Sequence, residues 1–492
     1  MDQKTTRRRF LQTGGTLAAA TLVGGRPLMA EGVSSTDEPG FLSAAELTAK
    51  LRNRDIGSEE LTHYFIQRIE QYDKQLNAIV VRDFDRALAA AKEADSLLVK
   101  GAIKGPLHGL PMTIKESYDV AGLPTTWGVP EAAQNIAKAD AAVVERFKSA
   151  GAVLLGKTNV PLNLGDFQSF NAIYGTTNNP WDLTRTPGGS SGGSAAALAA
   201  GLTGLDSGSD IGGSIRNPAH FCGVYGHKPT LGIVPSRGHQ PPGVPPSPQH
   251  PDLAVVGPMA RSAEDLSLAL EVVAGPNSLI SAGWHLKLPA PRMKALSGLR
   301  VALWPDDPMA PVSSEVIERV HAIGSALTKS GALVSDTARP GFAVQAAQET
   351  YLGILDGITA GPASKLTYFD YQRLHAHRGA LRVAWQQFFK DWDVLLCPTT
   401  ATTAFEQDQG AIGTRTIAVN GRQRPYFEQV FWAGLATLSY LPSTVFPTGL
   451  SAQGLPIGLQ AIGAEFDDRT TIEFARLMAD EMGGYQPPPG YV

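Results

Sequence analysis

Apolar residues recur at helical spacing near the start of the chain. Ser43 and Glu46 have the spacing of a capping box, in which the two side chains satisfy backbone N–H groups at the start of a helix. A second helix is predicted from Ser58, where residues three or four apart make one apolar stripe: Leu61, Phe65, Ile69 and Tyr72. A strand over 77–81 and a helix over 85–98 follow.

Beyond these elements, short apolar runs bounded by Gly or Pro alternate with helical patterns. Strands are predicted over 111–114, 152–155, 301–304, 394–397, 443–446 and 456–462. Helices are predicted over 141–149, 263–273, 314–330 and 470–482. The alternation indicates an α/β layered fold with a largely buried sheet. Residues 238–251 contain too many prolines for a helix or strand, so we expect an ordered surface loop or the rim of a pocket.

The N-terminus has the features of an export signal. Three arginines followed by Phe and Leu (7–11) precede an uncharged stretch and small residues near Ala30, a pattern typical of a twin-arginine signal peptide. The alternative is a basic N-terminus on a cytosolic protein. We predict a signal peptide over 1–30, a linker over 31–42 and one large domain over 43–492, in a periplasmic or secreted protein. No later segment is long and apolar enough for stable membrane insertion.

Charge balance and cysteine count narrow the class of protein. The 492 residues include 42 basic and 46 acidic side chains, and this net charge of −4 gives no reason to expect a nucleic-acid partner. Cys222 and Cys397 allow no disulfide framework, and we expect two unlinked, buried thiols. The ten histidines are scattered and no zinc or cofactor motif occurs, so neither a metal nor a cofactor is predicted.

Two Gly-Gly-Ser turns, at 188–190 and 212–214, flank a predicted helix over 194–201. A flexible linker is excluded because apolar, Ala-rich segments surround the glycines. A phosphate-binding loop would need Gly-Lys-Ser/Thr after the glycines, and a dinucleotide fingerprint is also missing. The first turn matches the G-x-S-x-G pattern of a nucleophile elbow, but turn residues precede it where an elbow needs a strand. Nothing singles out the histidines available to such an elbow, His375 and His377.

Three long blocks of the sequence resemble the amidase signature family: Gly109–Glu116, Thr186–Ser194 and Ser209–Thr230. Their order and spacing are similar to those of the family, and two shorter stretches, 174–181 and 455–460, resemble family members as well. The resemblance covers nearly the whole predicted domain. It implies a single large α/β domain in which helices cover both faces of a mixed central β-sheet.

The resemblance also implies a Ser–cis-Ser–Lys set of catalytic residues for amide hydrolysis. Ser214 would attack the carbonyl carbon, Ser190, preceded by a cis peptide bond, would pass on the proton, and Lys115 would receive it. A free lysine has a pKa of about 10.4, so burial must lower the pKa of Lys115 if the amine is to start the cycle uncharged. Backbone N–H groups of the second turn would form the oxyanion hole: Ile211, Gly212, Gly213 and Ser214.

Neighbouring residues are expected to support this set. Ser191 adjoins the relay serine, while Asp210 and Arg216 bracket the nucleophile and either hold its turn, through an ion pair, or contact the substrate. By resemblance, the stretch over 164–170 lines the substrate pocket: Leu164, Gly165, Asp166, Phe167 and Phe170. Its two phenylalanines favour an apolar or aromatic group in the substrate, with core packing as an equal alternative. Trp432 and the Pro-rich loop are candidates for the opposite wall.

Three functions stay open from the sequence. The first is an amidase that acts alone, as a monomer or homodimer, on a small-molecule amide. The second is the amidotransferase subunit that releases ammonia for charged transfer RNA, since it has the same three blocks. The export signal argues against it, because that work is cytosolic. The third is a catalytically silent binding protein on the same scaffold, and the three filled catalytic positions argue against this function.

Overall fold

The computed structural model describes residues 38–492. The predicted signal peptide and most of the predicted linker lie outside the described residues. From Glu38 the chain lies against helix α3 (Ser58–Leu76), because Arg68 of that helix pairs with the Glu38 carboxylate. The predicted capping box of Ser43 and Glu46 is formed at the start of α2 (Ala44–Asn53).

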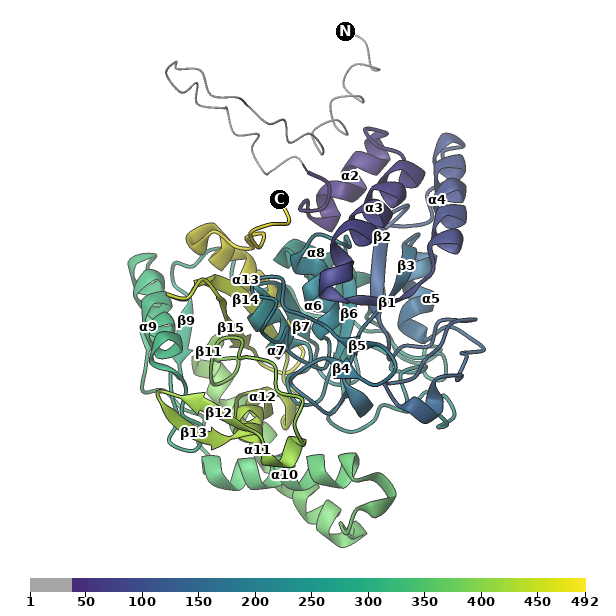
Figure 1. Cartoon of the computed structure of the whole chain (residues 1–492). Coiled ribbons are helices and arrows are strands. Elements are labelled where there is room, and N and C mark those ends of the chain that lie inside the picture. Colours follow the sequence, from purple (N-terminus) through teal and green to yellow (C-terminus); the bar gives the residue numbers. More distant parts are fainter. Residues whose placement is uncertain (1–37) are drawn as a thin grey trace, which may run out of the picture.

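An eight-stranded mixed sheet forms the centre of the molecule (Figure 1). β9 pairs in parallel with both of its neighbours, and the remaining pairs in this sheet are antiparallel. The order across the sheet is β10 (Leu333–Ser335), β9 (Arg300–Leu303), β11 (Val394–Pro398), β15 (Pro456–Ile462), β14 (Ser443–Leu450), β7 (Tyr225–Lys228), β8 (Val255–Ala260) and β6 (Asp206–Asp210).

A three-stranded sheet continues the large one beyond β6. Its order is β1 (Ile79–Arg82), β3 (Val153–Thr158) and β2 (Pro111–Lys115), with β2 parallel to β3. At the seam, the Thr113 N–H donates to the Leu205 carbonyl at 3.1 Å, so β2 lies beside the start of β6. This seam brings the end of β2 next to the two Gly-Gly-Ser turns.

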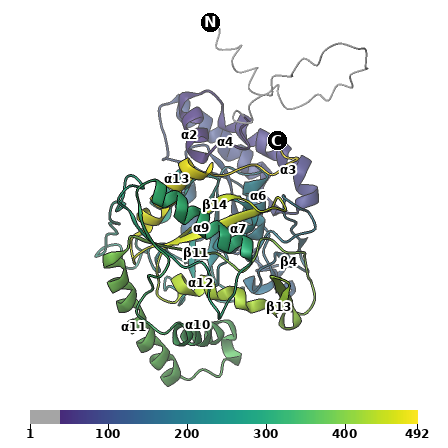
Figure 2. The ribbon, with the colours of Figure 1, turned by 90° about the vertical axis from the view of Figure 1, so that its left-hand side faces the viewer.

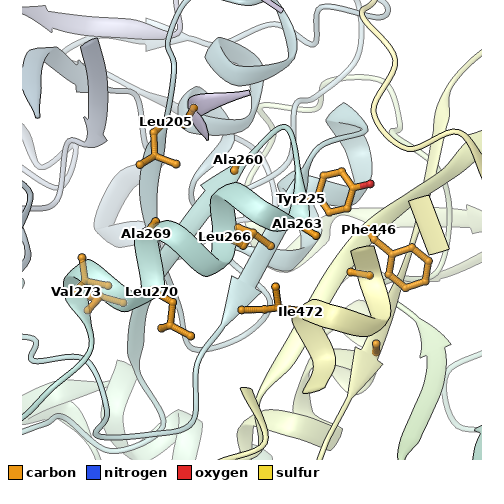
Figure 3. Close-up of a cluster of buried hydrophobic side chains, with 14 of the residues drawn as sticks. Leu205, Tyr225, Ala260, Ala263, Leu266, Ala269, Leu270, Val273, Phe446 and Ile472 are labelled. Atoms are coloured by element: carbon orange, nitrogen blue, oxygen red, sulfur yellow. The ribbon is translucent and has the colours of Figure 1, made fainter. Parts of the chain in front are cut away.

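Helices cover both faces of the large sheet. Alternate residues of each strand point to opposite sides, so both faces carry buried side chains. Met259 of β8 and Val445 of β14 join an apolar cluster with α6 (Gly192–Ala199) and α7 (Arg216–Cys222). The next residues, Ala260 and Phe446, face α8 (Ala263–Val273) and α13 (Asp468–Met482) in the main core (Figure 3). The single α/β domain that the sequence predicted, with a mixed sheet between helices, is confirmed.

The remaining elements surround this layered centre. α10 (Val344–Thr359) and α11 (Tyr368–Asp391) project from one end of the molecule as a helical hairpin (Figure 2). The other elements are α4 (Phe84–Val99), α5 (Ala142–Ser149), α9 (Ser314–Lys329), α12 (Val430–Thr437) and two small hairpins, β4 (Phe170–Asn171) with β5 (Gly175–Thr176) and β12 (Thr416–Val419) with β13 (Arg422–Pro425).

Most of the predicted elements are present. α8 and β15 have the predicted bounds, and the other predicted helices and strands are shifted by one to four residues at an end. In α3, Leu61, Phe65 and Ile69 are fully buried, as the apolar stripe predicted. Residues 238–251 form an irregular loop, and Cys222 and Cys397 are buried, unpaired thiols. Strand β6 was not predicted, because its residues are Asp, Ser and Gly without an apolar alternation.

Candidate active site

Lys115 ends β2 deep inside the molecule. The strand Pro111–Lys115 is buried at every position, and the lysine side chain has no exposed surface. Its Nζ lies 2.7 Å from the Ser190 Oγ and 2.9 Å from the Ser209 Oγ. An amine with two hydroxyl partners can donate to one and, when uncharged, accept a proton from the other.

Burial lowers the pKa of Lys115 to about 7. The charges of Asp210, Asp206 and Glu116 act in the opposite direction but do not offset the loss of hydration. A substantial fraction of the amine is therefore uncharged near neutral pH. This is the condition that a lysine must meet to act as a base.

The first Gly-Gly-Ser turn is tightly enclosed. The peptide bond between Gly189 and Ser190 is cis, and Gly188 has a φ of +90°. A Cβ atom on Gly189 would lie 2.3 Å from the backbone oxygen of Asp166, so only glycine fits there. The N–H groups of both glycines are occupied, since Gly188 donates to the Thr186 hydroxyl at 3.0 Å and Gly189 to the Asn217 side chain at 3.1 Å.

The second turn follows β6 and leads into α7, so that Ser214 lies next to the first turn. The N–H of Ser191 donates to the Ser214 carbonyl at 3.1 Å, which joins the two turns directly. Ser214 is 8% exposed, against 1% for Ser190, so the second serine is the one nearer to solvent. No hydrogen bond between the hydroxyls of Ser190 and Ser214 occurs in residues 38–492.

Backbone donors of the second turn differ in their availability. The Gly213 N–H donates to the Asp210 carboxylate at 2.9 Å, so this member of the predicted oxyanion hole is already occupied. Within the part of the chain that the structure describes, the N–H groups of Ile211, Gly212 and Ser214 donate to no other group. Three of the four predicted donors are thus without a partner in residues 38–492, and a buried carboxylate occupies the fourth.

Asp210 and Arg216 form the buried ion pair that was one of the predicted alternatives. Their closest atoms are 2.8 Å apart and both side chains are inaccessible to solvent. Although burial alone would raise it, the Arg216 charge and its hydrogen bonds hold the pKa of Asp210 at about 2. Arg216 also donates to the Ala433 carbonyl, Gln460 and Thr437. Its guanidinium is fully engaged in holding the turn and is not free for a substrate.

The stretch over 164–170 lies against the first turn, and its backbone from Asp166 to Gln168 contacts Gly189. Phe167 is buried against Tyr426, whereas Leu164 and Phe170 are half-buried and Gly165 is exposed. The Asp166 carboxylate accepts from Arg415 at 2.5 Å and from the Tyr426 hydroxyl at 2.6 Å. Asp166 therefore ties this stretch to the β12–β13 region and has no oxygen left without a partner.

Trp432 is not a pocket wall. Helix α12 is buried all round, and the Trp432 indole has no exposed surface, packs edge-on against Trp304 and Phe431, and donates to the Ala310 carbonyl. A tryptophan at this position of an all-apolar helix belongs to the core, and the prediction from sequence was wrong.

Two residues of the site were missed. Ser209 lies 2.9 Å from the lysine amine, and Tyr351 of α10 donates to the Ile211 carbonyl at 2.8 Å. The alternation of a strand would have placed Ser209 on one face of β6 with Ser207, but β6 was not predicted. No signal in the sequence could have found Tyr351, because only the tertiary fold brings α10 to the turn.

Other kinds of site find no support in residues 38–492. Within that range no group of three His, Cys, Asp or Glu side chains is placed to hold a metal ion, and no helix is both long and apolar enough to cross a bilayer. His377 contacts Thr350 and His375 contacts Arg378, so the histidines considered for a nucleophile elbow are engaged on α11.

Known proteins of similar sequence place the chain in a family. The family model described as Amidase matches residues 60–360 and 347–472. The chain belongs to the amidase family. An acylamidase of Rhodococcus erythropolis is 33% identical over 85% of this chain and 91% of its own length. A glutamyl-tRNA(Gln) amidotransferase subunit from Anaeromyxobacter dehalogenans is also 33% identical, over 91% of this chain and 98% of its own length.

A solved structure of a bacterial aryl acylamidase, a member of the amidase signature family, has the same fold. Its TM-score is 0.76 at 25% identity, and the match covers 92% of this chain and 97% of that one. The chain is therefore a hydrolase of the amidase signature family, a class of enzymes that act on amide carbon–nitrogen bonds.

Proposed function

We propose that this amidase hydrolyses a small-molecule carboxylic amide through an acyl-enzyme on Ser214, with Ser190 as proton relay and Lys115 as base. The observation that carries the proposal is the environment of Lys115, which favours the uncharged form of its amine. Lys115 is wholly buried, its Nζ lies 2.7 Å from the Ser190 Oγ, and burial brings its pKa to about 7. Lys157 is also buried with a hydroxyl partner, so the feature that favours a base is the location of the partner of Lys115 in the turn that contacts Ser214.

The proposed reaction conserves protons at every step. The Ser214 oxygen attacks the carbonyl carbon while its proton moves to the Ser190 oxygen, whose own proton moves to the Lys115 amine. The negative oxygen that develops would accept from the free N–H groups of the second turn. When the carbon–nitrogen bond breaks, the proton returns through Ser190 to the leaving nitrogen. Water then attacks the ester by the same route and releases the carboxylate.

For the substrate, we propose an amide with an apolar or aromatic group near the scissile bond. Side chains beside both turns belong to one apolar cluster, which includes Phe167, Ile211 and Val430. Two arginines beside these side chains are engaged, since Arg216 is paired with Asp210 and Arg415 with Asp166. A charged acyl group would have no free partner in this environment, and transfer of an unpaired charge into it is costly.

We further propose that the chain is exported through its twin-arginine-type N-terminus and acts without nucleic acid, as a monomer or homodimer. The export proposal rests on the arginine-containing N-terminal sequence. Fractionation of cells that produce the full chain, with and without lysine substitutions at the arginines of 7–9, tests it. Recovery of the unaltered chain solely in the cytosol would contradict it.

An ammonia-releasing amidotransferase subunit is the second candidate, favoured by a relative of that name with the same identity as the acylamidase. Such a subunit needs a glutamine site, whose charged α-carboxylate requires a cation. The engagement of Arg216 and Arg415 argues against this site. Glutaminase activity of the isolated chain, or its co-purification with transfer RNA and a partner subunit, would favour it.

A fluorophosphonate probe tests the proposed nucleophile. The unaltered chain should be labelled and should hydrolyse members of a panel of aryl, alkyl, peptide and lactam amides, whereas Ser214→Ala should lose both properties. Labelling that persists in Ser214→Ala would identify another nucleophile. Absence of both labelling and hydrolysis in the unaltered chain would instead favour a silent binding protein.

A further inference from the structure

Helix α10 of the projecting hairpin reaches the second turn through one buried side chain, Tyr351. The ring is 1% exposed and its hydroxyl donates to the Ile211 carbonyl at 2.8 Å. Burial raises the pKa of the Tyr351 phenol, so the hydroxyl remains a donor over the whole working range of pH. The amidase mechanism proposed above assigns no role to this residue.

The carbonyl that Tyr351 binds belongs to the same peptide group as the Gly212 N–H. The cis bond between Gly189 and Ser190 is the only one in residues 38–492, so the Ile211–Gly212 peptide is trans. In a trans peptide, the C=O and N–H point in opposite directions. A hydroxyl that fixes the Ile211 oxygen on one side therefore fixes the Gly212 N–H on the other, where no group of the described chain accepts from it.

The surroundings show that the position of the Tyr351 ring is enforced. A Cβ atom on Gly434 of α12 would lie 2.6 Å and 2.7 Å from two carbons of the ring, so the glycine makes room for it. Arg216 donates to the Thr437 hydroxyl at 2.8 Å, and Thr437 in turn lies beside the Tyr351 hydroxyl. The turn is thus held from two sides, by Asp210 at the Gly213 N–H and by Tyr351 at the Ile211 carbonyl.

We propose that Tyr351 is a positioning residue that orients and polarises the Ile211–Gly212 peptide, so that the Gly212 N–H is directed at the oxyanion of the reacting amide. A hydrogen bond to the carbonyl of a peptide strengthens its N–H as a donor, because the bonds polarise one another. Pre-orientation matters because a donor that must rotate into place contributes less to the transition state. The inference rests on the proposed function and adds a residue to it.

Tyr351→Phe removes one oxygen and tests the inference. kcat should fall about tenfold with KM within twofold of the unaltered enzyme, less than the roughly 100-fold that follows complete loss of an oxyanion-hole donor. Labelling of Ser214 by a fluorophosphonate should slow by a similar factor, since its phosphoryl oxygen needs the same donors. Gly434→Ala displaces the Tyr351 ring, so it should also lower kcat and leave KM nearly unchanged.

Tyr485→Phe is the matched control. Tyr485 also donates to a backbone carbonyl at 2.8 Å, that of Ala199, but at the end of α6. This variant should lose thermal stability to a similar extent and keep its kcat. If the unaltered chain is active, an unchanged kcat in Tyr351→Phe would overturn this inference alone. An equal fall of kcat in Tyr485→Phe would do the same. An unaltered chain that is neither labelled nor active would overturn the proposed function as well.

Discussion

The two Gly-Gly-Ser turns have the same three residues and opposite environments. At 188–190 a Cβ on either glycine would lie within 2.6 Å of neighbouring atoms, and both glycine N–H groups are occupied. At 212–214 the nearest atoms to such a Cβ are side-chain carbons 3.2 Å away, of Val430 and Ala433. There, only the Gly213 N–H has a partner within the described chain. The closed turn holds a hydroxyl against an amine, and the open turn leaves the N–H groups of Gly212 and Ser214 without a partner in the described chain.

This difference shows that the function of a glycine-rich motif cannot be inferred from the motif alone. In the closed turn glycine is required because backbone atoms approach too closely for a side chain. In the open turn it leaves room beside free N–H groups. The difference between the closed and the open turn depends on the hydrogen-bond partners that other residues supply: Asn217, Asp210 and Tyr351.

The largest expected effect comes from removing the Lys115 amine, which contacts the serine of the closed turn. Lys115→Met should lower kcat by about 10⁴-fold, at the upper end for loss of a general base, with the fold retained. Lys157→Met is the matched control, because Lys157 is an equally buried lysine on the adjacent strand that donates to the Thr125 hydroxyl and the Pro124 carbonyl. It should lose stability but keep its turnover. Near-normal rates in Lys115→Met would show that the closed turn serves no base.

Acidification should mimic that substitution reversibly. Burial lowers the pKa of Lys115 to about 7, so the amine becomes protonated, and unable to accept a proton, as the pH falls through that value. kcat/KM should therefore fall about tenfold for each pH unit below this point, by about 100-fold at pH 5. Rates measured over pH 5–9, with thermal unfolding recorded at each pH, check this. A profile that is flat to pH 5 would contradict a lysine base.

A pair of glycine substitutions sharpens the comparison between the turns. Gly189→Ala should destabilise the fold by about 3 kcal/mol, because its Cβ would overlap the Asp166 backbone oxygen. Gly212→Ala should change stability by less than about 1 kcal/mol, yet lower kcat/KM by about tenfold by narrowing access to the free donors. Urea unfolding and steady-state kinetics of both variants would distinguish them. Equal losses of stability would show that the two turns are packed alike.

The smallest effect is expected at Ser209, one of the two residues that the sequence analysis missed. Ser209→Ala removes one of two hydroxyl partners of the amine, which should lower kcat by about fivefold, in line with one lost hydrogen bond. The Ser209 hydroxyl stabilises the protonated amine more than the neutral amine, because the protonated form has more N–H groups to satisfy. Its removal should therefore lower the pKa of Lys115 and move the acid limb of the pH profile to lower pH. An unchanged limb would assign that limb to a group other than Lys115, such as Asp206, whose pKa burial raises to about 7.

Prediction from sequence succeeded where a local pattern carries the information. Apolar periodicity found α3 and α8, and the resemblance of the three blocks to a known family implied that Lys115 and Ser190 lie together, as they do. It failed where polar residues are buried. The strand β6 contains Asp206 and Ser209, which are stable in the interior because other elements supply their partners.

By itself, the sequence determined the layered α/β fold and the family, because periodicity and motif order can be read along the chain, and it supplied the three side chains proposed to react. Only the tertiary structure decided which N–H groups are free, that Trp432 is core, that Arg216 is fully engaged, and that α10 reaches the open turn. These depend on contacts between residues up to 244 positions apart. Burial, which lowers the pKa of Lys115, exists only once such contacts are made.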